Sequence, residues 1–260
     1  MRVLIKNLKS HDYAVLRKPF ESGRQSPSNL AGILIVGIPF LWLFYYLTYS
    51  VAAEMTIFPN VERIKSIQFN TTLIVSILCL IFAIPIVYKK LGWVQYVINT
   101  IFSQLIFCVS PFIIALYILG QQENATRESL LNFTYIALAI GISIFIVTCI
   151  RFYLLLRKGA YREGSSKDKL RNKFEKSSYL PVVIVASTGL VLLLQYAIRT
   201  IPTDSIEDFT LIYLPLIISY MMVFVLPEQL VLIYCKLRFK AFNFNSRGYL
   251  YDLEKTDLNH

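Results

Sequence analysis

The chain of 260 residues is 56% hydrophobic and 16% charged, and its formal net charge is +10. A soluble domain carries about 25% charged residues, so this composition excludes a disordered chain, a disulfide scaffold and a typical soluble enzyme. The mean hydropathy is +0.56, and the apolar residues come in long blocks rather than at one-face spacing. Together these features predict an all-α polytopic membrane protein.

Six stretches have roughly the 20 mostly apolar residues that a helix needs to cross the hydrocarbon core. In chain order they are Leu30–Tyr49, Thr72–Val87, Val94–Leu119, Leu130–Leu156, Leu180–Ile198 and Phe209–Ile233. The second stretch is short, so its helix is expected either to start earlier, near Ile67, or to thin the bilayer locally. We therefore predict a bundle of six transmembrane helices over residues 30–233, between an N-terminal segment, 1–29, and a C-terminal tail, 234–260.

The basic residues support one orientation of this bundle. Segments 1–29, 88–93, 157–179 and 234–260 together hold 21 of the 26 Lys and Arg residues, whereas segments 50–71, 120–129 and 199–208 hold four. Cytoplasmic loops carry such an excess of positive charge. We therefore expect a multi-pass protein of the cell membrane with both termini in the cytoplasm. The orientation of the chain in the lipid bilayer accounts for its positive net charge, so no nucleic acid partner is expected.

The basic inner loop, 157–179, contains the sequence KDKLRNKFEK at Lys167–Lys176, with Leu170 and Phe174 four residues apart. This spacing permits a short amphipathic helix in the headgroup layer. The alternative is a solvated loop whose charges only fix the orientation of the chain.

Both tails contain patterns that could form a small cytoplasmic β element. In the C-terminal tail, Phe242-x-Phe244 and Tyr249-x-Tyr251 flank Gly248, which predicts a hairpin with its turn at the glycine. The apolar run Tyr13–Leu16 of the N-terminal segment could pair locally in the same way. The alternative is two tails that lie at the membrane interface or remain flexible.

The sequence lacks the residue sets that carry most enzyme chemistry. It contains no GxxxxGK[ST], GxSxG or HExxH motif. It therefore predicts no nucleotide hydrolysis, no serine nucleophile of the α/β-hydrolase type and no zinc site of a metalloprotease. The four cysteines form no CxxC pair, and the two histidines lie in the tails: Cys79, Cys108, Cys149, Cys235, His11 and His260. We therefore expect no enzyme activity, no metal and no cofactor.

Two ionisable residues fall inside the predicted spans, where a charge costs about 2.5–3.5 kcal/mol at the bilayer centre. Glu228 lies eight residues before Lys236, and Arg151 lies six before Arg157. Both are therefore about 9–12 Å from the inner boundary at 1.5 Å rise per residue. An ion pair between Glu228 and Arg151 would neutralise both charges. The alternatives are a structural tether, or an Arg151 side chain that reaches the headgroups.

Polar amides extend this candidate intramembrane polar site, at Gln104, Gln195 and Gln229. Such side chains most often form hydrogen bonds between helices. The fourth predicted span also has two small-residue ridges, Ala137-x-x-x-Gly141 and Ala139-x-x-x-Ser143, which allow close helix packing. Prolines lie within or near most spans and predict kinks that could serve moving helices or a static bundle.

The run Tyr234–Lys240, the Phe242 and Phe244 pair after it, and the chain length carry a resemblance. The chain resembles small six-span membrane proteins of Gram-positive bacteria, from uncharacterised families linked to type VII secretion loci or to toxin immunity. This resemblance implies a non-enzymatic protein that binds a toxin or a secretion component. The alternative is a transporter, or an ABC-exporter permease subunit partnered by an ABC ATPase, that uses Glu228 as a buried polar site.

Overall fold

A computed structural model describes residues 8–176, 209–245 and 247–253. Within these ranges the protein is helical and has no sheet. Five helices are long and apolar enough to cross a membrane: Pro27–Ala52, Val61–Ala83, Gly92–Leu119, Arg127–Arg157 and Thr210–Arg238. The chain is thus a polytopic membrane protein. Five of the six predicted spans are present, and the predicted span Leu180–Ile198 lies outside the described residues.

The spans divide into labelled elements. The first consists of α2 (Pro27–Tyr46) and the π-helical segment η2 (Leu47–Ala52), and the second is α3 (Val61–Ala83). The third consists of α5 (Gly92–Gln104), the π-helical η3 (Leu105–Val109) and α6 (Ser110–Leu119). The last two are α7 (Arg127–Arg157), and the π-helical η4 (Phe209–Tyr213) with α11 (Leu214–Arg238).

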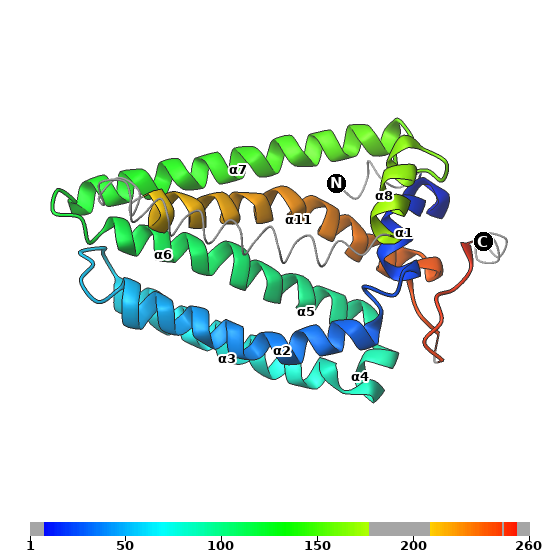
Figure 1. The fold of residues 1–260 in the computed structure, drawn as a ribbon, viewed down its shortest axis with the longest axis horizontal. Coiled ribbons are helices and arrows are strands. Elements are labelled where there is room, and N and C mark those ends of the chain that lie inside the picture. The colour runs from blue at the N-terminus through cyan, green and yellow to red at the C-terminus, as the bar shows by residue number, and fades with distance from the viewer. Residues whose placement is uncertain (1–7, 177–208, 246, 254–260) are drawn as a thin grey trace.

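The described connections gather at two opposite ends of an elongated bundle (Figure 1). The tail end carries α1 (Ala14–Glu21), α4 (Pro85–Lys90), α8 (Ser166–Lys176) and the C-terminal tail. The loop end carries the connections before α3 and before α7. Helices α7 and α11 both run from the loop end to the tail end. The described segments that are richest in Lys and Arg therefore share one end.

The second span has different limits from those expected. Its helix starts at Val61, well before Thr72, and its first two turns carry Glu62, Arg63 and Lys65. It ends at Ala83 because Ile84, with φ −72° and ψ 126°, is extended. A proline disfavours the helical conformation of the residue before it, and Pro85 follows Ile84. The expected extension to Val87 is therefore wrong, since Pro85 starts the separate helix α4.

Two of the π-helical segments end two residues before a proline. Segment η3 ends at Val109, before Pro111, and η4 ends at Tyr213, before Pro215. Proline lacks an N–H group and its ring clashes with the carbonyl one turn earlier, so a locally wider turn accommodates it. The Ser219 hydroxyl on α11 donates a hydrogen bond to the Cys108 carbonyl of η3 at 2.9 Å. The two irregular spans are thereby joined.

The described part of the N-terminal segment contains the helix α1, and its apolar side chains belong to the core. Tyr13, Leu16 and Phe20 recur at helical spacing and are at most 2% exposed. They pack with the ends of α7 and α11 and with Phe242 of the short 3₁₀ helix η5 (Lys240–Phe242). The expectation of an extended pairing segment at Tyr13–Leu16 is therefore wrong. Helical spacing places these side chains on one face, where the spans cover them.

The C-terminal tail turns back as expected, but its described residues form a single antiparallel bridge, between Phe244 and Leu250. Gly248 has a φ of 87°, which favours glycine in the turn. The Arg17 side chain of α1 donates a hydrogen bond to the Tyr251 carbonyl. We call α1, α8 and residues 239–253 the tail cap, because together they cover the tail end of the spans.

A glycine of α2 packs directly against an aromatic ring of α5. A Cβ atom on Gly37 would lie 2.0 Å from Cζ of Phe102, whereas one on Gly32 would meet no atom within 4 Å. We predict that Gly37→Ala lowers the free energy of unfolding by about 1–3 kcal/mol, the usual cost of overpacking. Unfolding in detergent micelles, followed by circular dichroism, measures the effect.

The matched control is Gly32→Ala, which should leave stability unchanged or raise it slightly. Adding Phe102→Leu to Gly37→Ala should recover part of the loss, because the smaller side chain makes room. Equal destabilisation by the two glycine substitutions would contradict this packing.

Candidate functional site

Glu228 lies on α11 directly after Pro227, in the half of the span nearest the tail end. Its Oε1 atom accepts a hydrogen bond from Nη1 of Arg171 on α8 at 2.8 Å. The two side chains are 30% and 26% exposed. A carboxylate at this position in an apolar helix needs a compensating charge, and the tail cap supplies it.

Local interactions fix the start of α8 and so position Arg171. The Asp168 N–H donates to Oγ of Ser165 at 3.2 Å, and the Gly164 N–H donates to Oδ2 of Asp168 at 3.0 Å. These bonds satisfy donors that the first turn of a helix leaves unpaired. Asp168 is 5% exposed, and its Oδ1 atom lies 3.8 Å from Nζ of Lys18 on α1. Helix α8 is thus held to both α1 and α11.

The Glu228–Arg171 pair forms part of the wall of a cavity of about 600 Å³. The other lining residues include Tyr161 and two further cations, Lys167 and Lys173. Three cations against one carboxylate make this cavity positive, so its chemistry favours a negatively charged group. A smaller cavity of about 80 Å³ shares Glu228 and Tyr161 with it and is also lined by Arg151.

Tyr161 stands between the two cavities as a neutral phenol. Burial raises its pKa to about 12. Nζ of Lys167 donates to the Tyr161 hydroxyl at 2.9 Å and lies 4.1 Å from the ring centroid. Burial, and then the positive charge of Arg151, lower the pKa of Lys167 below its ordinary value. The cations are thus close enough to influence one another.

Arg151 and Glu228 line one small cavity, but the structure gives Glu228 a different partner from the one expected. The Arg151 guanidinium lies over the Phe224 ring, 5.7 Å from its centroid. Among the described residues, the ion-pair partner of Glu228 is Arg171. The Glu228 carboxylate is therefore paired with Arg171 of the tail cap rather than with Arg151 of the neighbouring span.

Two of the predicted amides meet. Nε2 of Gln104 donates to Oε1 of Gln229 at 3.0 Å and to the Met222 carbonyl at 3.3 Å. This bond joins α5 to α11, which is the usual role of amides between membrane helices. Gln195 lies outside the described residues. The predicted site therefore divides into a charged part at Glu228 and an amide bridge.

The sequence reasoning missed Arg171, Lys167 and Tyr161. The sequence placed the only acid in a predicted span on the same side as the most basic loop, but the excess of positive charge on the cytoplasmic side explained that loop equally well. It also missed a second polar chain, in which the Tyr49 hydroxyl donates to Oε1 of Gln68 at 2.6 Å and Nε2 of Gln68 donates to Ser110 at 3.1 Å. This chain joins the first three spans.

In the described ranges, His, Cys, Asp and Glu side chains form no group of three that could hold a metal ion. Comparison with protein-family models, curated proteins and solved structures finds no match for the chain. The function of the site must therefore be inferred from its geometry. The site is a positively charged cavity with the Glu228–Arg171 ion pair in its wall.

We predict that Glu228 is energetically coupled to Arg171 and not to Arg151. Each single glutamine substitution of the Glu228–Arg171 pair should destabilise the protein, because it leaves a charge unpaired near the apolar part of the span. A double-mutant cycle with Glu228→Gln and Arg171→Gln should give a coupling energy of about 1 kcal/mol or more. The free energy of unfolding in detergent micelles measures it.

The matched cycle uses Glu228→Gln with Arg151→Gln and should give a coupling energy close to zero. A larger coupling to Arg151 than to Arg171 would contradict the observed pairing.

Proposed function

We propose that the chain is a non-enzymatic protein of a bacterial plasma membrane that binds a membrane-active toxin or a secretion-system component. Its role would be immunity or an accessory function in secretion. The observation that carries this proposal is the surface of α7, the least covered of the five spans. Its most apolar window is 11% buried within the protein, against 22–44% in the other four.

The two ridges of small residues on α7 are used differently. Ala137 is buried, and its carbonyl accepts a hydrogen bond from the Tyr220 hydroxyl of α11 at 3.0 Å. The other ridge, Ala139 and Ser143, lines a cavity of about 600 Å³ on the surface of α7. The first ridge therefore packs inside the protein, and the second lines a cavity that the described residues leave open.

The chemistry of this cavity suits a transmembrane helix of a partner. Small residues allow helix backbones to approach closely in lipid, where no hydrophobic force drives association. The cavity contains the hydroxyls of Ser143 and Thr148, and Arg151 lies at its tail-end side. A partner helix with a carboxylate at matching depth would find an opposite charge there.

The proposal includes six spans and a cytoplasmic tail end. Two observations support it. Helices α7 and α11 both run from the loop end to the tail end, and the described tail-end segments carry most of the described Lys and Arg residues. An excess of such residues is typical of the cytoplasmic side.

A second candidate function is a transporter, or an ABC-exporter permease subunit. The observation that favours it is the position of Glu228 between two cavities, with cations around it. A substrate flux that Glu228→Gln abolishes while the folded protein persists would support this candidate, as would an ABC ATPase encoded beside it.

We predict that Ser143→Trp removes partner binding, because the indole fills the α7 cavity. Cells that produce the protein should keep their membrane potential when a membrane toxin encoded beside it is expressed, and cells with Ser143→Trp should depolarise. A potential-sensitive dye measures the effect. The matched control is Ile142→Trp, since Ile142 is 59% exposed on the same helix but does not line this cavity.

Failure of the unaltered protein to protect against any neighbouring toxin would contradict the immunity role. Equal loss of protection in both tryptophan variants would contradict the assignment of the partner to this cavity.

A further inference from the structure

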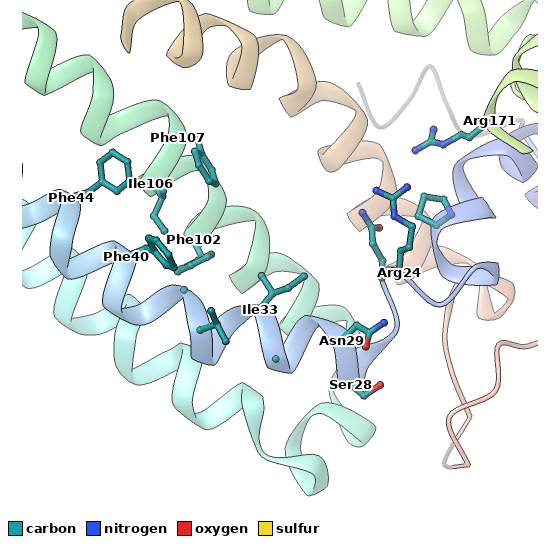
Figure 2. A pocket seen from close by; sticks show the side chains of 15 residues that line it. Arg24, Ser28, Asn29, Ile33, Phe40, Phe44, Phe102, Ile106, Phe107 and Arg171 are labelled. Atoms are coloured by element: carbon teal, nitrogen blue, oxygen red, sulfur yellow. The ribbon is translucent and has the colours of Figure 1, made fainter. Parts of the chain in front are cut away.

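A groove of about 1250 Å³ lies along α2 and the segment formed by α5 and η3 (Figure 2). It is larger than the roughly 300–1,000 Å³ of a typical small-molecule site. Its tail-end part is polar and includes Arg24, Asn29 and Arg171. The remainder is apolar and aromatic, lined by Ile33, Phe40, Phe44, Phe102, Ile106 and Phe107.

The polarity of the groove changes along the membrane normal, as that of a lipid does. From Asn29 to Phe44 the wall of α2 extends about 22 Å at 1.5 Å rise per residue. One leaflet contributes about 15 Å of hydrocarbon, half of the bilayer core. Val36 and Phe40 are 64% and 52% exposed along this wall. An acyl chain that starts near Asn29 therefore meets apolar side chains through the whole depth of its leaflet.

The polar part of the groove is positively charged. Arg24 and Arg171 line it, and no Asp or Glu is among its described lining residues. Nη1 of Arg171 bonds Glu228, but a guanidinium has five N–H donors and can serve a second anion. Arg171 also borders the cavity that contains Lys167 and Lys173, which adds to the positive potential.

One acceptor in the groove lacks a donor. Oε1 of Gln25 is buried and has no hydrogen-bond partner among the described residues, and Gln25 lines the groove beside Arg24. A buried acceptor of this kind is normally satisfied. A ligand that carries a hydroxyl group would supply the missing donor once the Gln25 side chain turns toward the groove.

We infer that the groove binds one anionic phospholipid with a hydroxyl-bearing headgroup, of the phosphatidylglycerol type, from the leaflet at the tail end. The phosphate lies between Arg24 and Arg171, the headgroup hydroxyl faces Gln25, and an acyl chain follows Ile33 and Phe40. This site is separate from the α7 cavity and does not depend on the proposed partner.

The test measures thermal unfolding of the full chain in a neutral detergent, titrated with phosphatidylglycerol or phosphatidylcholine. A ligand that binds only the folded state raises the midpoint temperature. Near a membrane surface each basic residue contributes about 1 kcal/mol to the attraction of an anionic lipid, so two should give about a tenfold preference for phosphatidylglycerol or more. The variant with Arg24→Gln and Arg171→Gln should lose this preference, and Arg24→Gln alone should lose part of it if the double variant is unstable.

Gly32→Leu tests the acyl-chain path. A side chain there enters the groove, since a Cβ atom would meet nothing within 4 Å, so this variant should bind both lipids more weakly. The controls are Gly92→Leu and Arg247→Gln, which line a different cavity and not this groove, and both should keep the full preference.

Equal affinity for the two lipids, or an unchanged preference in the arginine variants, would overturn the inference. Glycerol 3-phosphate that stabilises as strongly as the lipid would assign the site to a soluble anion instead. Destabilisation by Gly32→Leu without lipid would show that the protein itself fills the groove, and a dimer lost in that variant would assign it to a second copy.

Discussion

The arrangement at the tail end depends on the neutralisation of one carboxylate. Glu228 lies within the last span, where an unpaired charge is costly, and Arg171 provides its partner at 2.8 Å. Because Arg171 belongs to α8 and not to a span, the ion pair attaches an extramembrane helix to the bundle. Capping by Ser165 and Asp168, and the approach of Asp168 to Lys18, set the position of that helix.

A buried cation on α11 makes further contacts with the tail cap. Lys236 is 5% exposed, and its Nζ atom lies 4.2 Å from the centroid of the Phe20 ring. The same atom donates a hydrogen bond to the Phe242 carbonyl at 3.1 Å. A buried ammonium needs such acceptors and aromatic faces. The end of α11 is therefore held by α1 and by the residues that follow α11, and the described parts of both tails belong to the fold.

Hydropathy predicted the five described spans to within a few residues at most ends, because a helix that crosses lipid must be long and apolar. It could not predict that α3 would begin at Val61, since that end is charged and lies beyond the apolar block. Glu228, Gln104 and Gln229 were recognisable as polar groups in apolar helices. The sequence did not show that Arg171 is the partner of Glu228, because the excess of positive charge in cytoplasmic loops explains this residue equally well. Helical spacing at Tyr13, Leu16 and Phe20 was present in the sequence, but hydropathy alone does not show that a short polar segment is buried.

Hydrogen exchange in α8 tests the central claim most directly. In the unaltered protein, amides of α8 should be protected, and Glu228→Gln should speed their exchange, because the helix loses its attachment to α11. The charge-reversed pair, with Arg171→Glu and Glu228→Arg in one chain, should restore protection that each single reversal removes. Equal exchange in all five proteins would contradict the account, because α8 would then be held without this ion pair.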